Sequence, residues 1–561
     1  MKGKILKVIG ISFLVFVVLS WIIPVGTYSN GSLTTNDVDP VGLIDLFTQP
    51  VIAFANFAIY GAVFAAIGGF YGVMEKTGAL DKVTDWLKIR FEKRGKLFLA
   101  LTVVFFAVLS SVTGLILPLF LLVPLFAAAL FKMDYDKVTV LASTVGALLV
   151  GSIGSTLGFN ISGYTKNMLY LEDMFSEMWA KVILLVLLVA GLILVVLLGS
   201  KKRHETVELA TENASLAVKS DVKEVSKKEE KVENVEAKPT KKTSKAETKA
   251  SAKKTEKATV ETKATTKKAT SKTTKTTKKT TSKTTATRGR KPGRKTNTKG
   301  LAIAHDVKKI PNEKQVSGIP FVVILILTMI VAVLGMYDWS NSFGISVFTD
   351  LYNNIMNIKI GDFPIFEHLF SGSSEFGRWT NYDFVALVIF ASMLIAWLYR
   401  LKVNEYIESF IDGVKKWIPT AAYVILAFVV CTVVLQQISA QTGTMVDTIN
   451  SKIFELSDGF NVIFTGAASL IGSFCFNDLY YLLYDMYAFI GGYDATILPI
   501  AGLLVQAVYG VAMLIFPTSV VLIAGLSLFN VSYKQWMKYI WKFALIAFLL
   551  VLLVCGILTL L

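Results

Sequence analysis

Cysteine and histidine are scarce in this chain, which has three of each among 561 residues. Cys431, Cys475 and Cys555 lie far apart in apolar stretches, a spacing that suits neither a disulfide framework nor a zinc site. His204 and His305 both fall in a segment of low complexity. The sequence contains no cluster of ligating side chains and no nucleophile beside a base, so we expect neither an enzyme nor a bound cofactor.

Charge is also scarce outside one segment. The chain is 53% hydrophobic and 17% charged, with a mean hydropathy of +0.57, which is too apolar for a soluble protein of this length. Several apolar runs reach the roughly 20 residues needed to cross a bilayer. The first run, Ile5 to Ile23, is too long for a cleavable signal, and Pro24-Val25-Gly26 is not a cleavage site. We therefore predict an all-α polytopic membrane protein in the cell membrane.

Residues 201–313 form a basic segment of low complexity, rich in Lys, Thr, Ala and Glu. Its excess of basic residues is larger than the net charge of +16, so the rest of the chain is slightly negative. We predict a disordered cytoplasmic linker between two membrane halves, 1–200 and 314–561, because it has too few apolar residues to offset the entropy cost of ordering. Alternatively the linker binds anionic lipid or nucleic acid, since Arg288 to Arg294 resembles the AT-hook, an arm that binds the minor groove.

The distribution of basic residues predicts about nine crossings, with the N-terminus in the cytoplasm and the C-terminus outside. Two pairs of neighbouring apolar runs are too short for each run to cross the membrane by itself, and each pair indicates a re-entrant hairpin. The predicted hairpins are Leu97–Leu109 with Leu115–Phe131, and Ile463–Phe474 with Leu479–Ile490. Two crossings are interrupted, at Gly151–Thr156 and at Phe516–Ser519. Three amphipathic stretches, Ala79–Arg94, Val403–Trp417 and Met445–Leu456, are expected to lie on the membrane surfaces.

Residues 51–199 and 418–561 repeat one order of elements. Each has a crossing, an amphipathic helix, a hairpin, a broken crossing and a final crossing, and the charge pattern gives the two copies opposite orientations. Inverted repeats are typical of secondary transporters, which bind substrate near the midplane at discontinuous helices. We expect the two tips and the two breaks to meet at one site.

The same segments carry a resemblance to a known family. The motifs are Ser20 to Gly26, Gly68 to Ala79, Gly154-Ser155-Thr156, Pro517-Thr518-Ser519 and Val531 to Trp536. In this order they resemble the C4-dicarboxylate anaerobic carrier family, in its DcuC and YfcC-like branch of the ion transporter superfamily. The resemblance implies a carrier of carboxylates, amino acids or aminoacyl compounds, coupled to ions or protons. It also implies an elevator-like motion, often in a homodimer, and Na+ as one candidate coupling ion.

The chain departs from the family pattern at several positions. Ser111 and Val112 stand where the family pattern has two acidic residues near the first tip. Gly158 and Phe159 replace an Asn-Pro, and the second tip, usually rich in Ser and Gly, is here Cys475 to Asp478.

Polar and small residues at the tips and breaks are the candidate substrate or ion ligands. They are Ser110, Ser111 and Thr113 at the first tip, Ser152, Ser155, Thr156 and Asn160 at or after the first break, Asn477 and Asp478 at the second tip, and Thr518 and Ser519 at the second break. The alternative for the hydroxyls is helix packing, capping or repair of a proline kink. A carboxylate at membrane depth is costly, so Asp478 indicates an ion, a partner or a water cavity, unless it lies at the interface.

These observations predict a secondary active transporter of a small carboxylate-bearing solute, such as a dicarboxylate, an amino acid or a short peptide, coupled to Na+ or H+. The alternative is a non-transporting anchor or sensor that acts through its basic linker on anionic lipid or nucleic acid.

Overall fold

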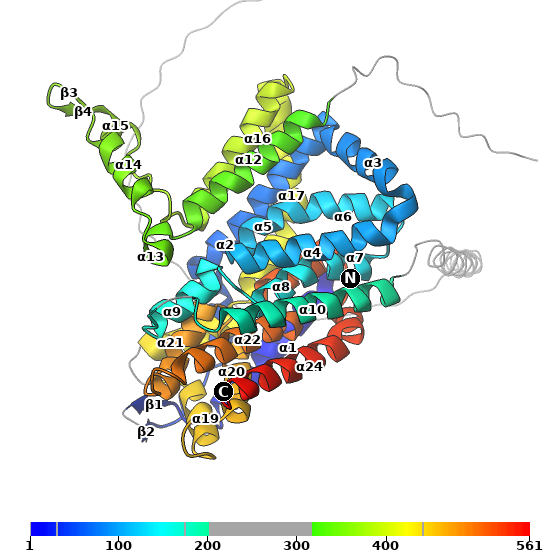
Figure 1. The fold of residues 1–561 in the computed structure, drawn as a ribbon. Helices are drawn as coiled ribbons and strands as arrows, with labels where there is room; N and C mark the ends of the chain where they lie inside the picture. The colour runs from blue at the N-terminus through cyan, green and yellow to red at the C-terminus, as the bar shows by residue number, and fades with distance from the viewer. Residues whose placement is uncertain (1, 30–31, 173–174, 201–316, 440–442) are drawn as a thin grey trace, which may run out of the picture. The chain divides into compact units, whose positions relative to one another are not determined.

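The computed structural model describes residues 2–29, 32–172, 175–200, 317–439 and 443–561. The predicted linker 201–313 and its AT-hook-like segment therefore lie outside the described residues. Within the described ranges the chain is almost wholly helical, with two short antiparallel β-hairpins (Figure 1).

The first half contains one β-hairpin and a series of helices of very different lengths. Its elements are α1 (Lys2–Ser20), β1 (Gly26–Ser29), β2 (Ser32–Thr35), α2 (Asp45–Thr77), α3 (Ala79–Phe91), α4 (Gly95–Thr113), α5 (Ile116–Leu119), α6 (Val123–Lys132), α7 (Lys137–Leu141), α8 (Ala147–Ile153), α9 (Tyr164–Met168) and α10 (Met178–Gly199). Ala142–Gly146 and Phe159–Gly163 are wider, π-helical turns, and Glu92–Arg94 and Phe120–Leu122 are tighter, 3₁₀ turns.

The second half begins with a crossing-length helix and a small connecting subdomain. Its elements are α12 (Ile319–Met336), α13 (Trp339–Phe343), α14 (Val347–Met356), β3 (Lys359–Ile360), β4 (Phe363–Pro364), α15 (Ile365–Leu369), α16 (Asn381–Leu398), α17 (Val403–Leu426), α18 (Val429–Ser439), α19 (Met445–Phe454), α20 (Val462–Cys475), α21 (Leu479–Ile490), α22 (Leu498–Ile515), α23 (Val520–Phe529) and α24 (Tyr533–Leu558).

Eight helices in the described ranges are long and apolar enough to cross a membrane. They are Asp45–Thr77, Ala79–Thr113, Met178–Gly199, Ile319–Met336, Asn381–Leu398, Val403–Ile438, Leu498–Phe529 and Tyr533–Leu558. The apolar helix α1 lies at the position of the predicted first crossing. The predicted class, an all-α polytopic membrane protein, is confirmed.

Both predicted hairpins form, and each turns at the expected residues. α4 ends at Thr113, where Gly114 takes a left-handed conformation (φ 68°) that allows the chain to reverse. The returning helix α6 ends at Lys132, which forms ion pairs with Asp81 and Asp85 of α3, so the hairpin comes back to the level at which it started. α20 and α21 form the second hairpin, with its tip at 476–478.

The last helices of the two repeats, α10 and α24, run antiparallel to each other. A Cβ at Gly191 would lie 3.3 Å from Phe543, and one at Gly199 would lie 2.8 Å from Tyr539. The chain numbering therefore increases along one helix and decreases along the other.

The two broken crossings also pair antiparallel. A Cβ at Gly510 of α22 would lie 2.8 Å from Ile153, at the end of α8, and one at Gly502 would lie 2.8 Å from Thr165 in α9. Corresponding elements with opposite directions are what an inverted repeat requires. The boundaries of the predicted halves and repeats stay a prediction.

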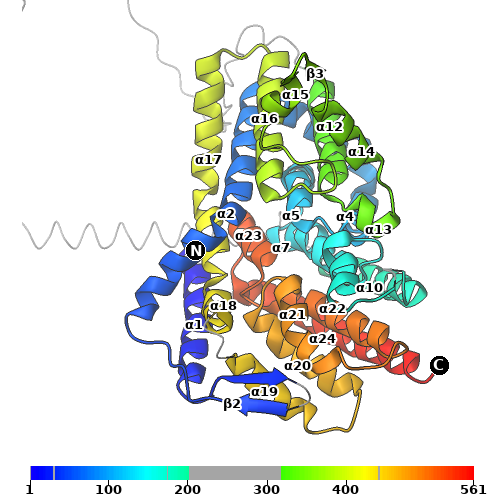
Figure 2. The same cartoon turned by 90° about the vertical axis from the view of Figure 1, so that its left-hand side faces the viewer.

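The predicted surface helix Val403–Trp417 is wrong as a separate element, because α17 continues from Val403 to Leu426. α17 packs antiparallel along α2, with both helices side by side in Figures 1 and 2. A Cβ at Gly413 would lie 2.2 Å from the Gly68 carbonyl oxygen, and a Cβ at Gly72 would lie 2.2 Å from the Ser409 carbonyl oxygen. These glycines let the two backbones meet, which holds the amphipathic segment against α2.

Candidate functional site

The first hairpin tip is bonded directly to the first helix break. The Ser111 hydroxyl donates to the Gly154 carbonyl oxygen at 2.7 Å, and the Thr156 amide donates to the Ser111 carbonyl oxygen at 3.1 Å. A Cβ at Gly158 would lie 2.7 Å from the Gly114 Cα, so neither position has room for a side chain. Backbone groups freed by the break are thus satisfied by the tip.

The second tip makes the equivalent contact with the second break. The Asn477 side-chain amide donates to the carbonyl oxygens of Thr518 (3.2 Å) and Ala427 (3.3 Å). The break itself, residues 516–519, lies between α22 and α23, and Ser519 caps α23 by accepting from the Leu522 amide at 3.4 Å.

Two polar side chains of α22 connect the first break to the second tip. Gln506, which is fully buried, donates from Nε2 to the Ser155 carbonyl oxygen at 3.1 Å. One helical turn later, the Tyr509 hydroxyl donates to the Asn477 carbonyl oxygen at 3.0 Å. Ser155, Asn477 and Thr518 therefore belong to one continuous set of contacts, as the predicted geometry requires.

A cavity of about 170 Å³ lies where these segments meet. Both tips and the segments that follow the two breaks contribute to its wall, together with α2 and α22. Among its lining residues are Tyr60, Gly114, Asn160, Tyr164, Asn381, Asn477, Asp478, Tyr509 and Val520.

The predicted residues divide into three groups in the structure. Asn160, Asn477 and Asp478 line the cavity. Ser111, Ser155 and Thr156 hold the first tip against the first break, and the Thr518 carbonyl receives Asn477.

The remaining predicted hydroxyls satisfy local backbone groups. Ser110 donates to Leu148, Thr113 to Leu109 and Ser152 to Leu149, all through carbonyl oxygens, and Ser519 is a helix cap. These four do not line the cavity, which matches the alternative of packing and capping.

Sequence reasoning missed Tyr60, Tyr164, Gln506 and Tyr509. Each is a polar side chain within or beside an apolar helix, and that pattern was the available signal. The predictions concentrated on the interruptions and therefore overlooked polar residues inside continuous helices.

Asp478 has two polar neighbours and no basic one among the described residues. One carboxylate oxygen accepts from the Tyr480 amide at 2.9 Å, which caps α21, and the other accepts from the Tyr60 hydroxyl at 3.3 Å. No Lys or Arg is among the residues that line the cavity. The helices α21 and α23 begin beside it, and their N-terminal amides place partial positive charge there.

Two buried oxygen atoms of the second tip and second break lack a hydrogen-bond partner among the described residues. They are the Asn477 side-chain oxygen and the Thr518 hydroxyl, on residues that are 6% and 3% exposed. Leaving a buried polar atom unpaired costs about 1–3 kcal/mol, so such atoms mark a place where water, an ion or a solute supplies the missing partner.

The fold and this cavity define a multi-pass membrane protein with discontinuous helices around an internal binding space, the class to which membrane transporters belong. A family model described as "C4-dicarboxylate anaerobic carrier" matches residues 291–560, slightly less than half of the chain, and two of the five motifs that carried the resemblance, Pro517-Thr518-Ser519 and Val531 to Trp536, lie within the match. The matched family is a family of transporters. No curated protein and no solved structure matches the chain.

Proposed function

We propose that this chain is a secondary active transporter of a small carboxylate-bearing solute, with a four-carbon dicarboxylate as the first candidate. The family match supports the class of solute. The observation that carries the proposal is the 170 Å³ cavity between the two tips and the segments that follow the two breaks, with an unpaired buried oxygen on Asn477 in its wall and another on the adjoining Thr518.

The size of the cavity favours a small solute over a peptide. Drug-sized ligands occupy pockets of about 300–1,000 Å³, and this one is smaller. Tyr60 and Tyr509 contribute hydroxyls and ring surface, and Asn160 contributes an amide. The Asn160 amide and the helix N-termini can donate to a carboxylate, whereas the Tyr60 and Tyr509 hydroxyls already donate to Asp478 and to the Asn477 carbonyl.

The charge of the cavity supports coupling to a cation. Asp478 and an anionic solute would repel each other at short range in a low-dielectric space. A Na+ ion or a proton bound with the solute would cancel this repulsion, and transport would then depend on the cation. Asp478 and Asn477, which line this cavity, are the proposed ligands, and the unpaired Thr518 hydroxyl at the adjoining break is a further candidate.

The packing of the helices supports an elevator-like movement. α2, α12, α16 and α17 pack mainly on one another, whereas α4, α8, α10, α20, α22 and α24 form a second group that carries the tips and breaks. Movement of the second group against the first would carry the cavity across the membrane. A homodimer, formed through the first group, would hold that group still.

Basic residues support a cytoplasmic location for one end of these helices. Lys416 in the middle of α17 pairs with Glu75 near the end of α2, and Lys132 at the end of α6 pairs with Asp81 of α3, so basic residues gather where α2 ends and α3 begins. The positive-inside rule places these ends in the cytoplasm, together with the N-terminus and the linker, and the C-terminus outside.

Uptake of labelled succinate by proteoliposomes containing the purified full-length protein tests the proposal, with and without Na+ and with a pH gradient. Asn477→Ala should lower uptake at least about tenfold, since it removes the side-chain hydrogen bond between the second tip and the second break. Asn353→Ala, on the exposed face of α14, is the matched control and should leave uptake unchanged. Absence of uptake by the wild type for every carboxylate tested would refute the proposal.

A deletion of residues 205–310 separates this proposal from the alternative, a membrane anchor that acts through its basic linker. Uptake that survives the deletion supports the transporter. A biological activity that disappears with the linker, in a protein that transports nothing, supports the anchor.

A further inference from the structure

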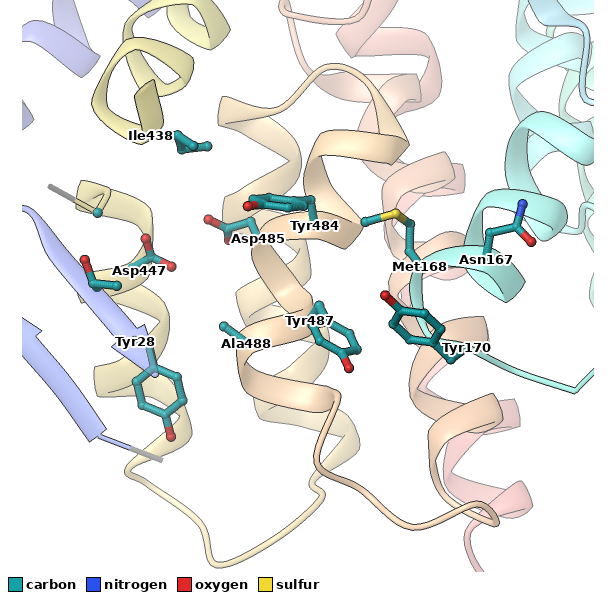
Figure 3. A pocket seen from close by; sticks show the side chains of 12 residues that line it. Tyr28, Asn167, Met168, Tyr170, Ile438, Asp447, Tyr484, Asp485, Tyr487 and Ala488 are labelled. Atoms are coloured by element: carbon teal, nitrogen blue, oxygen red, sulfur yellow. The ribbon is translucent and has the colours of Figure 1, made fainter. Parts of the chain in front are cut away.

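A second and larger cavity, of about 550 Å³, lies between α19, α21, α9 and the first β-hairpin. Two carboxylates, Asp447 of α19 and Asp485 of α21, line it and point toward one another in Figure 3. Asp485 is 5% exposed. Neither carboxylate forms an ion pair in the described part of the chain, and the lining residues include no Lys, Arg or His.

Local structure fixes the position of both carboxylates. Asp447 belongs to a capping box, in which one of its oxygens accepts from the Thr444 hydroxyl (2.7 Å) and amide (2.9 Å). Thr444 is in turn bridged to Gly26 of β1 by two backbone hydrogen bonds of 3.0 Å. Tyr28 of β1 stacks on Phe489 of α21 at 4.3 Å between ring centroids, so the β-hairpin joins α19 to α21.

A buried amide beside Asp485 has an unpaired oxygen atom. Asn450 is fully buried, and its Nδ2 lies 3.4 Å from an Asp485 carboxylate oxygen, so its amide group faces the acid. The side-chain oxygen of the same amide has no hydrogen-bond partner in the described ranges. Two carboxylates and an amide oxygen are the hard oxygen ligands that a small cation prefers.

We propose that Asp447 and Asp485 hold one monovalent cation, Na+ or H+, between them. Two carboxylates that face each other, Asp485 buried and Asp447 half-buried, favour a positive charge between them, because each raises the energy of the other's charge. A proton shared by the pair and a Na+ ion bound between them are two forms of the same compensation.

Four tyrosines are the other titratable groups among the residues that line this cavity. Tyr28 faces it from β1, Tyr170 from the segment after α9, and Tyr484 and Tyr487 from α21 itself. The Cys475 thiol of α20 is close enough to interact electrostatically with Asp485. Burial raises the pKa of the Asp447 carboxyl to about 6, even though the Thr444 hydrogen bonds act in the opposite direction.

α21 connects this cation site to the solute cavity, and this step rests on the proposed transport function. Asp485 follows Asp478 by two helical turns, about 10 Å along the same helix. A cation that draws α21 toward α19 would also set the position of Asn477 and Asp478 at the tip. Occupancy of one cavity would then control the geometry of the other.

Thermal denaturation of the purified full-length protein, with NaCl varied against choline chloride at about pH 8 and about pH 5, tests the site. The variants are Asp447→Asn and Asp485→Asn, with Asp458→Asn, an exposed acid just after α19, as the matched control. Without Na+ at the higher pH, both test variants should melt at a higher temperature than the wild type, since each removes one of two repelling charges.

Two results support the site and identify the cation. A rise in melting temperature with NaCl that both test variants lose and Asp458→Asn keeps identifies Na+. Stabilisation by acid alone, lost in the same two variants, identifies the proton. The proposal would be overturned if Asp447→Asn and Asp485→Asn responded to NaCl and pH as the wild type does. If Asp485→Asn does not fold, the response of Asp447→Asn alone decides the outcome.

A separate measurement distinguishes failure of this site from failure of the transport proposal. The cation response is measured without solute, and the shift in melting temperature caused by succinate is measured in parallel. A wild type that responds to the cation and never to any carboxylate retains the cation site and loses the transport function. A succinate shift that is equal in wild type and Asp485→Asn at every NaCl concentration overturns the coupling through α21.

Discussion

Replacing Gly114 by Ala tests the contact between the first tip and the first break. Gly114 has φ 68° and ψ 0°, and a left-handed conformation costs a non-glycine residue about 1–2 kcal/mol. A Cβ at this position would also lie 3.0 Å from the Gly158 Cα and 3.2 Å from the Asn160 amide nitrogen. Overpacking of this kind costs about 1–3 kcal/mol more, because both partners are backbone and cannot rotate away.

Gly78→Ala is a closely matched control. Gly78 also ends a helix in the left-handed region, with φ 70° and ψ 3°, but a Cβ there would meet nothing within 4 Å. Gly78→Ala should therefore lose about 1–2 kcal/mol of stability and retain transport. Gly114→Ala should lose about 2–5 kcal/mol and most of its transport, because Asn160 would be displaced from the cavity wall.

The two variants are compared by thermal denaturation in one detergent and by succinate uptake per folded molecule in proteoliposomes. Normalising uptake to folded protein separates a displaced binding site from a smaller yield. Equal losses of stability and uptake in Gly78→Ala and Gly114→Ala would refute the reasoning, since the contact with Gly158 would then contribute nothing.

Three further predictions concern other parts of the fold. Because burial raises the pKa of Asp447 from 3.8 to about 6, the protonated form favours the folded state. In the absence of Na+, the melting temperature should therefore fall as pH rises from about 4 through about 6, and Asp447→Asn should remove this dependence. Tyr509→Phe leaves the Asn477 carbonyl without its donor and should cost about 1–3 kcal/mol by thermal denaturation, whereas Tyr382→Phe, an exposed tyrosine, should cost nothing measurable. Gly72→Ala would place a Cβ 2.2 Å from the Ser409 carbonyl oxygen and should sharply reduce the yield of folded, monodisperse protein in size-exclusion chromatography. Gly10→Ala, with open space around it, should leave the yield unchanged. Equal yields of the two variants would contradict the packing of α2 on α17.

Much of the backbone path could be predicted because interruptions leave a local signal. The break before α23 was expected at Phe516–Ser519, and α22 ends at Ile515 while α23 begins at Val520. The first break was expected at Gly151–Thr156 and lies slightly later, since α8 continues to Ile153. Glycine and hydroxyl residues that interrupt an apolar run cannot continue a helix as favourably, and this effect depends on neighbouring residues alone.

The contents of the two cavities were harder to predict, because they depend on contacts between distant segments. Gln506 and Ser155 are separated by more than half of the chain, and nothing around Gln506 indicates that it faces a break. The pairing of Asp447 with Asp485 could not be predicted for the same reason, since each acid by itself resembles an ordinary residue of an amphipathic helix. The prediction that Val403–Trp417 lies on the membrane surface was wrong for a related reason. Gly413 of this segment packs against the glycines of α2, which are distant in the sequence.

The direct backbone contact between α2 and α17 limits how the molecule can change shape. Side chains at an ordinary helix interface can switch rotamers and let one helix slide, but at Gly72 and Gly413 the two backbones themselves meet. A shift by one turn, about 5.4 Å, would bring the Trp417 side of α17 against Gly72, where the backbones leave no room for an indole. We therefore expect α2 and α17 to move together without sliding against each other. The helix movement proposed for transport would then occur at the contacts between this pair and the other helices.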